Sequence, residues 1–171
     1  MIRNRLLTFE RTPNPESLEI YCDGEGLLDL IHYLSKLAGR DPHMTDHDHW
    51  MAESIGGHDL TAQKQGLSNA LYEMVTAHYI PPGKESKSQT AAAGRLLTII
   101  AGPPGGECEI FGDFAGLHRL IDRLRTLASG DSTRPFSDIW TTTSPDGGML
   151  TDENWAKRGT LVKQVTLHYR P

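Results

Sequence analysis

EIYCDGEGLLDLIHYLSKLA, at Glu19–Ala38, and EIFGDFAGLHRLIDRLRTLA, at Glu109–Ala128, are two versions of one pattern in a chain of 171 residues. Each version starts with a short apolar run that predicts a strand. It continues with apolar residues spaced three or four apart, which predicts an amphipathic helix. Each helix also has an expected N-cap and a closing glycine, Asp23 and Gly39 in the first version and Asp113 and Gly130 in the second.

The likeness extends along the chain and indicates an internal duplication with an offset of about 90 residues. Other matching segments are RLLTF and RLLTI (Arg5–Phe9, Arg95–Ile99), DHW and DIW (Asp48–Trp50, Asp138–Trp140), and VTAHYIP and VTLHYRP (Val75–Pro81, Val165–Pro171). We therefore define a first repeat, residues 5–81, and a second repeat, residues 95–171. Residues 82–94 are small, polar and without apolar periodicity, which is typical of a linker.

The periodicity within one repeat predicts the order strand-strand-helix-strand-strand. The first two strands are LLTF and LEIYC, a third runs from His47 to about Glu53 before a Gly-Gly turn, and a fourth covers Leu71–Tyr79. A unit this small with one helix has a marginal core, so the two repeats should pack together. We expect an α+β, pseudo-twofold domain with mostly antiparallel strands and one long helix per repeat.

The third strand of the first repeat contains the motif DHDHW, Asp46–Trp50. Because side chains alternate along a strand, His47 and His49 should share one face and Asp48 and Trp50 the other. The second repeat keeps the aspartate and the tryptophan but has serine and isoleucine in place of the histidines. The Asp/Trp face is therefore predicted to be architectural, whereas the histidine face is peculiar to the first repeat.

A His-x-His pair on a strand can chelate zinc or another transition metal, with His43 or His58 as a third ligand. One hypothesis is therefore a metal-binding protein or metal-dependent enzyme centred on His47 and His49. The chain contains no His-Glu-x-x-His motif and no paired cysteines, so the other interpretation is a solvated polar surface with no cofactor. The residues alone leave both open.

Other signatures of catalysis are missing, because there is no Gly-x-Ser-x-Gly motif and Cys22 and Cys108 have no counterparts in the other repeat. His78 and His168 occur in both repeats and are interpreted as histidines hydrogen-bonded across strands. The net charge of -5 disfavours nucleic acid as a partner. No apolar run could span a membrane, and the start of the chain does not resemble a secretory signal, so we expect a cytoplasmic protein. Because signatures of catalysis are missing, we expect that it is not an enzyme.

The charge is divided unevenly between the repeats. The first repeat has 5 Lys/Arg and 12 Asp/Glu, whereas the second has 9 of each, and six of the eight histidines lie in the first. An acidic surface speeds the capture of basic partners, so the first repeat is predicted to carry a partner-binding face. The alternative is that these charges only solvate the protein. The candidate contact residues are Asp41, Asp46, His47, Asp48, His49, Glu53, His58 and Asp59.

The capped helix, the His-x-His strand, the Gly-Gly-x-x-Leu turn and the final HY pair resemble the thirty-second numbered immunity-protein family of bacterial polymorphic-toxin systems. The likeness occurs once in each repeat, but the second repeat departs from it by lacking the two histidines. The matching motif positions are His47, His49, Gly56, Gly57 and Leu60. The resemblance implies a non-catalytic inhibitor that neutralises a cognate toxin protein. An acidic inhibitor suits a basic toxin that acts in the cytoplasm, such as a nuclease. We also expect a monomer that contains an internal pseudo-dimer.

Overall fold

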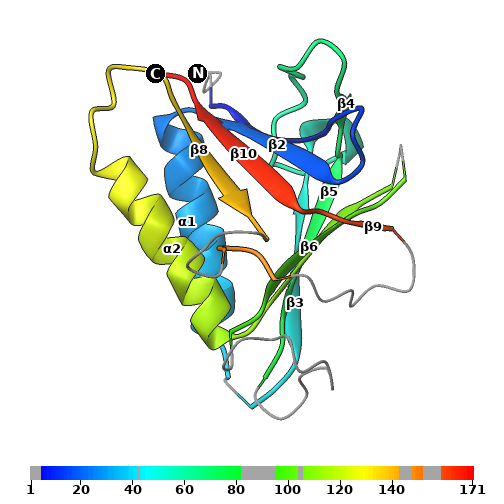
Figure 1. Ribbon diagram of the computed structural model, residues 1–171, viewed down its shortest axis with the longest axis vertical. Helices are drawn as coiled ribbons and strands as arrows, with labels where there is room; N and C mark the ends of the chain where they lie inside the picture. Colours follow the sequence, from blue (N-terminus) through cyan, green and yellow to red (C-terminus); the bar gives the residue numbers. More distant parts are fainter. Residues whose placement is uncertain (1–4, 42, 82–94, 104–105, 143–147, 152–158) are drawn as a thin grey trace.

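The computed structural model describes residues 5–41, 43–81, 95–103, 106–142, 148–151 and 159–171 (Figure 1). The predicted linker, residues 82–94, lies outside these ranges. The described residues form two α-helices, a short 3-10 helix at Glu53–Ile55 and two five-stranded sheets, which confirms the predicted α+β class.

The two helices lie where the repeated pattern predicts them. Helix α1 covers Gly24–Ala38 and helix α2 covers Phe114–Ala128. The Asp23 carboxylate accepts a hydrogen bond from the Gly26 amide at 2.8 Å, and Asp113 caps α2 in the same way. Helix α1 ends at Gly39 as expected, whereas the C-cap of α2 is Ser129, one residue before the predicted glycine.

The strands follow the predicted order with one difference. In the first repeat they are β1 (Leu7–Arg11), β2 (Ser17–Cys22), β3 (Asp46–Met51), β4 (Ala70–Leu71) and β5 (Met74–Tyr79). In the second repeat they are β6 (Leu97–Ala101), β7 (Cys108–Gly112), β8 (Phe136–Thr141), β9 (Thr160–Leu161) and β10 (Gln164–Tyr169). The predicted fourth strand of each repeat is thus divided into two pieces, β4 and β5 or β9 and β10.

The two repeats exchange strands. Sheet A has the order β4-β1-β2-β10-β8, and sheet B has the order β3-β5-β7-β6-β9, so each sheet contains strands of both repeats. Sheet B, taken in reverse, matches sheet A strand by strand, which is the predicted pseudo-twofold arrangement. The pairs β2/β10 and β5/β7, which join the repeats, are parallel, and all other strand pairs in the described residues are antiparallel. We call the two parallel pairs the seams.

Tyr72 lies where the chain of the first repeat crosses from one sheet to the other. Its amide donates to the carbonyl of Phe9 on β1 at 2.9 Å, while the carbonyl of the next residue, Glu73, accepts from Ala52 beside β3 at 2.8 Å. The tyrosine side chain is buried, and its hydroxyl donates to the carbonyl of Gly102 in the second repeat. The fourth strand is therefore interrupted because its two halves have partners in different sheets.

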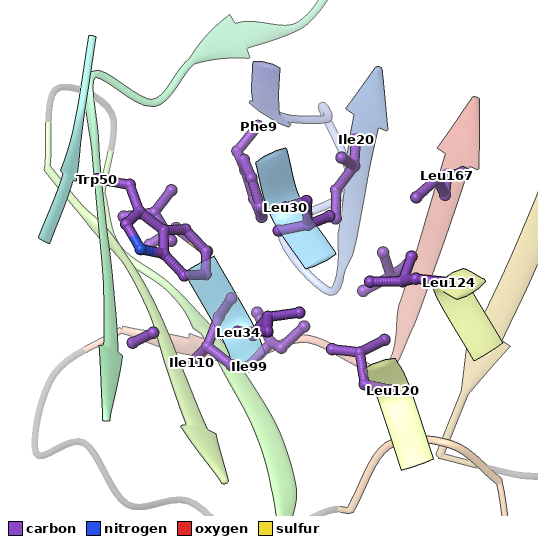
Figure 2. Close-up of a cluster of buried hydrophobic side chains, with 14 of the residues drawn as sticks. Phe9, Ile20, Leu30, Leu34, Trp50, Ile99, Ile110, Leu120, Leu124 and Leu167 are labelled. Atoms are coloured by element: carbon purple, nitrogen blue, oxygen red, sulfur yellow. The ribbon is translucent and has the colours of Figure 1, made fainter. Parts of the chain in front are cut away.

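One hydrophobic core joins both repeats (Figure 2). Leu30 and Leu34 of α1 and Leu120 and Leu124 of α2 pack among side chains from both sheets, including Trp50 on β3. The helices also contact each other, and Figure 1 shows them side by side. The N-terminal turn of α1 approaches the chain before β1 so closely that a Cβ on Gly26 would lie 1.8 Å from the carbonyl oxygen of Leu6. Only glycine fits there.

The exchange predicts how separated repeats behave. Residues 5–81 alone would lack the β10 and β7 partners at both seams, leaving two strand edges and part of the core exposed. We expect this half to have no cooperative unfolding transition as a monomer. It should gain one only when it pairs with residues 82–171 or with a second copy of itself. Circular dichroism melting and light scattering would measure this. A monomeric first half with its own sharp melting transition would contradict the expectation.

Candidate functional site

The candidate contact residues lie along one edge of sheet B. Strand β3 is the outermost strand of that sheet and pairs only with β5. The outer side of its backbone is partly covered within the chain, because His47 bonds to Arg40 and Asp46, and Met51 bonds to Asp59 and Leu60. Asp41 and His43 lie in the loop before β3, and Glu53, His58 and Asp59 follow it. We call β3 and its two flanking loops, residues 41–59, the first-repeat edge.

The alternation predicted for β3 is present. His47 and His49 are exposed, and they pair across the sheet with His78 and Thr76 of β5. Trp50 points the other way, is 1% exposed, and packs in the core (Figure 2). In the second repeat, the indole N–H of Trp140 donates to Asp138 at 2.7 Å, whereas the indole N–H of Trp50 has no hydrogen-bond partner among the described residues. The Asp/Trp face therefore belongs to the architecture, although its polar contacts differ between the repeats.

The histidine face is ordered by a chain of hydrogen bonds. The Thr76 hydroxyl donates to the Glu107 carboxylate at 2.7 Å and lies 2.9 Å from Nδ1 of His49. A hydroxyl has one hydrogen, so Thr76 must accept from His49, whose Nδ1 therefore carries a proton. In the neutral imidazole the lone pair is then on Nε2. Glu107 directly precedes β7, which pairs with β5 at the seam. A residue of the second repeat therefore positions Thr76 and His49 of the first.

His78 forms a second contact across this seam. Its Nε2 lies 3.1 Å from a carboxylate oxygen of Glu109, and its ring stacks on Phe111 with 4.4 Å between centroids. At the other seam, His168 stacks on Tyr21 of the first repeat, its Nδ1 lies 3.0 Å from the Ser137 hydroxyl across the strand pair, and its Nε2 lies 3.6 Å from Glu19, beyond hydrogen-bond distance. The interpretation of both histidines as cross-strand partners is confirmed, and each one bridges the two repeats.

The acidic candidates are less free than their number suggests. Asp46 pairs with Arg40 at 2.9 Å, and Asp48 lies 3.9 Å from the same guanidinium. The hydrogen bond from Arg40 holds the pKa of Asp46 below its usual value. Asp41 accepts from the amide of His43, and Asp59 accepts from the amide of Met51. The carboxylates in the middle of the edge are therefore partly neutralised, while Asp41 and Glu53 at its ends are exposed.

The histidines that the motif suggested as a third metal ligand lie in loops. His43 and His58 are both exposed, and the carbonyl of His58 accepts from Arg5. The ring contacts of His47 are instead with His49, at 4.9 Å, and with His78, at 6.0 Å between centroids. Within the described ranges, no group of three His, Cys, Asp or Glu side chains is arranged to hold a metal ion.

The equivalent edge of the second repeat is built differently. Strand β8 is the outermost strand of sheet A, with Ser137 and Ile139 at the histidine positions. Arg123 of α2 binds Asp138 through two nitrogens, and this pair lines a hollow of about 500 Å³ between α2 and β8. The histidine-bearing surface is therefore confined to one of the two equivalent edges.

Two remaining sequence expectations concern cysteines and membranes. Cys22 and Cys108 are free and buried in strands, as predicted, and burial raises the pKa of both thiols. In the part of the chain that the structure describes, no helix is long and apolar enough to cross a membrane.

Comparison with known proteins gives one match. A family model described as Immunity protein 32 matches the chain twice, over residues 17–71 and 107–162. Each match runs from the second strand of a repeat past its helix and edge strand, so it includes both β3 and β8. Neither the curated proteins nor the solved structures gave a match.

The environment of His78 predicts a pH-dependent stability. Burial lowers the pKa of His78, although the hydrogen bond to Glu109 opposes this effect. The unfolded chain then binds the proton more readily, so stability should fall as the pH drops below about 6.5, the ordinary histidine pKa. We expect the melting temperature of His78→Gln to fall less between pH 7.5 and 5.5 than that of the unmodified protein. His32→Gln, on the exposed surface of α1, is the control, and equal pH dependence in all three proteins would contradict this assignment.

Proposed function

Because the chain belongs to the Immunity protein 32 family, we propose that it binds and neutralises a cognate bacterial toxin through its first-repeat edge. The family match supports the toxin-neutralising role, and it covers both repeats. The choice of surface is supported by the comparison between the repeats. Both edges meet the needs of the same fold, but only the first carries exposed histidines and most of the acidic residues.

The proposed contact surface contains all eight residues of the acidic and histidine pattern. These are Asp41, Asp46, His47, Asp48, His49, Glu53, His58 and Asp59. The outward backbone groups of His47 and Met51 are already bonded within the chain, so the side chains on the exposed face of β3 would select the partner. His47 and His49 are the exposed side chains of that face, so they are the ones that we assign to direct contact.

Charge supports a basic partner, with most of the attraction at the two ends of the edge. Arg40 already binds Asp46 and lies near Asp48, which leaves the exposed Asp41 and Glu53 as the groups with the most freedom to meet Lys or Arg. Such charges raise the association rate and select the partner more than they raise affinity. A basic, cytoplasm-acting toxin such as a nuclease fits this surface.

We propose inhibition by occlusion, without a reaction, a cofactor or nucleic acid. A specific inhibitor complex buries on the order of 800 Å² on each partner, which a six-residue edge strand with two loops can supply. The single core shared by both repeats gives this edge a rigid support. The chain would act as a monomer, with the second repeat as scaffold.

Two equivalent aspartates allow a matched test. Asp41 and Asp131 occupy the same position in the two repeats, both are exposed, and each accepts the amide of the residue two positions later at 2.9 Å. Asp131 also accepts from the Thr133 hydroxyl at 2.6 Å and lies 3.8 Å from Arg134, so lysine should cost the fold at least as much there as at Asp41. With the toxin domain encoded beside this gene, we expect Asp41→Lys to weaken binding about tenfold, more strongly at low salt, and Asp131→Lys to have little effect.

The histidines can be tested with residues that the fold already accepts. The double variant His47→Ser, His49→Ile installs the side chains of the second repeat, Ser137 and Ile139, at the equivalent positions. It loses the hydrogen bond between His49 and Thr76, so its melting temperature should fall only slightly, and it should lose affinity for the toxin domain in calorimetry. Unchanged affinity in this variant, together with equal effects of the two lysine variants, would remove the first-repeat edge as the contact surface.

A further inference from the structure

The loop at residues 62–69, which connects the first-repeat edge to β4, holds the most exposed apolar side chain among those described. Leu67 is 98% exposed, compared with 60% for Leu28 on α1. The chain reaches this loop directly from the edge, because Leu60 donates to the carbonyl of Met51 at the end of β3 and Thr61 donates to the carbonyl of Leu7. Single exposed leucines are common, so exposure alone assigns no role to Leu67.

A buried carboxylate holds this loop in place. Glu10 on β1 has no exposed surface, and its two oxygens accept hydrogen bonds from the amides of Gln65, at 2.6 Å, and Gly66, at 2.9 Å. The side-chain amide of Asn69 donates to Glu10 at 3.1 Å and to Glu19 at 2.6 Å. All three groups that bond to Glu10 from the loop are donors, as a carboxylate requires.

Further contacts fix the tip of the loop. The Lys64 ammonium donates to the carbonyl of Leu67 at 3.2 Å, and Asn69 donates its backbone amide to Gly66. Arg170, near the end of the second repeat, donates to the side chain of Gln65 at 2.7 Å. The backbone that carries Leu67 is thus held on both sides.

The fold itself does not require this carboxylate. The equivalent position in the second repeat is Ile100, which is 1% exposed and packs in a hydrophobic cluster. Burying a carboxylate is unfavourable unless its hydrogen bonds compensate, and an apolar residue of similar size would avoid the cost. The first repeat therefore carries a buried charge whose described partners, apart from Thr8, belong to the loop.

We propose that residues 62–69 form a pre-ordered docking loop and that Leu67 enters an apolar pocket on the toxin. This inference rests on the proposed function and names a second contact beside the first-repeat edge. A loop that is ordered before binding loses less conformational entropy when the complex forms, so its apolar tip contributes more to affinity. Apolar anchors in partner pockets are the usual centres of binding energy in protein interfaces.

The role of Leu67 is tested by comparing aspartate substitutions at Leu67 and at Leu28, a second exposed leucine. Leu67→Asp and Leu28→Asp each put a carboxylate where a large apolar side chain is mostly exposed, so neither should change the melting temperature greatly. In calorimetry with the toxin domain encoded beside this gene, we expect Leu67→Asp to weaken binding about 30-fold or more, and Leu28→Asp less than threefold. Equal affinities of both variants would overturn the docking role of Leu67.

The carboxylate is tested in the free protein, without a toxin. Glu10→Ile copies the second repeat and should speed hydrogen exchange at the amides of Gln65 and Gly66, while exchange in α1 stays unchanged. Glu10→Gln retains one acceptor oxygen, so its exchange rate at these amides should lie between those of the unmodified protein and Glu10→Ile. This variant provides a measurement if the isoleucine variant folds poorly. Unchanged exchange in both variants would overturn the pre-ordering.

The two levels of the account fail in different ways. If the unmodified protein does not bind the toxin domain, the proposed function fails and the docking role fails with it. If the unmodified protein binds and Leu67→Asp binds equally well, only the docking role is overturned. Tight binding that is lost in Leu67→Asp and weakened in Glu10→Ile supports both the contact and its pre-ordering.

Discussion

The two parallel seams, β2/β10 and β5/β7, are the constraint on which this structure depends. Each seam pairs a strand of one repeat with a strand of the other, so neither sheet is complete within one repeat. A repeat with one helix could not bury enough apolar surface alone, and the exchange lets both helices and both sheets share one core. At each seam a histidine stacks on an aromatic ring of the other repeat, and at the β5/β7 seam His78 also hydrogen-bonds Glu109, which adds side-chain contacts to the backbone pairing.

Because the two repeats share one core and both sheets, their surface residues can differ without changing the fold. The second repeat stabilises its edge aspartate, Asp138, with an arginine from its own helix, and it buries Ile100 where the first has Glu10. The first repeat has histidines on its edge strand and uses a buried carboxylate to order a loop. The edge histidines and the buried carboxylate are polar groups that the fold does not require, and both lie in the first repeat. This pattern is what binding to a partner through one repeat would produce.

Local features of the fold could be predicted from the sequence, and pairings between distant segments could not. The helix stripes, Asp23 as N-cap and the two faces of β3 follow from spacing alone, because each depends on residues within a few positions. The strand exchange depends on which of two equivalent repeats a strand pairs with, and the periodicity is the same for both choices. For the same reason, the sequence pointed to His43 and His58 beside the histidine pair, whereas His78, 31 positions from His47, is the neighbour across the sheet. The charge count likewise could not reveal that Arg40 neutralises part of the edge.

The central claim is that one repeat is scaffold and the other carries the binding surface. Hydrogen–deuterium exchange of the intact protein, alone and with its cognate toxin domain, tests this most directly because it compares the two equivalent edges in one experiment. The account predicts that the toxin slows exchange in residues 41–51 and 62–69 and leaves residues 131–141 unchanged. Slower exchange at β8, or equal protection of β3 and β8, would contradict it.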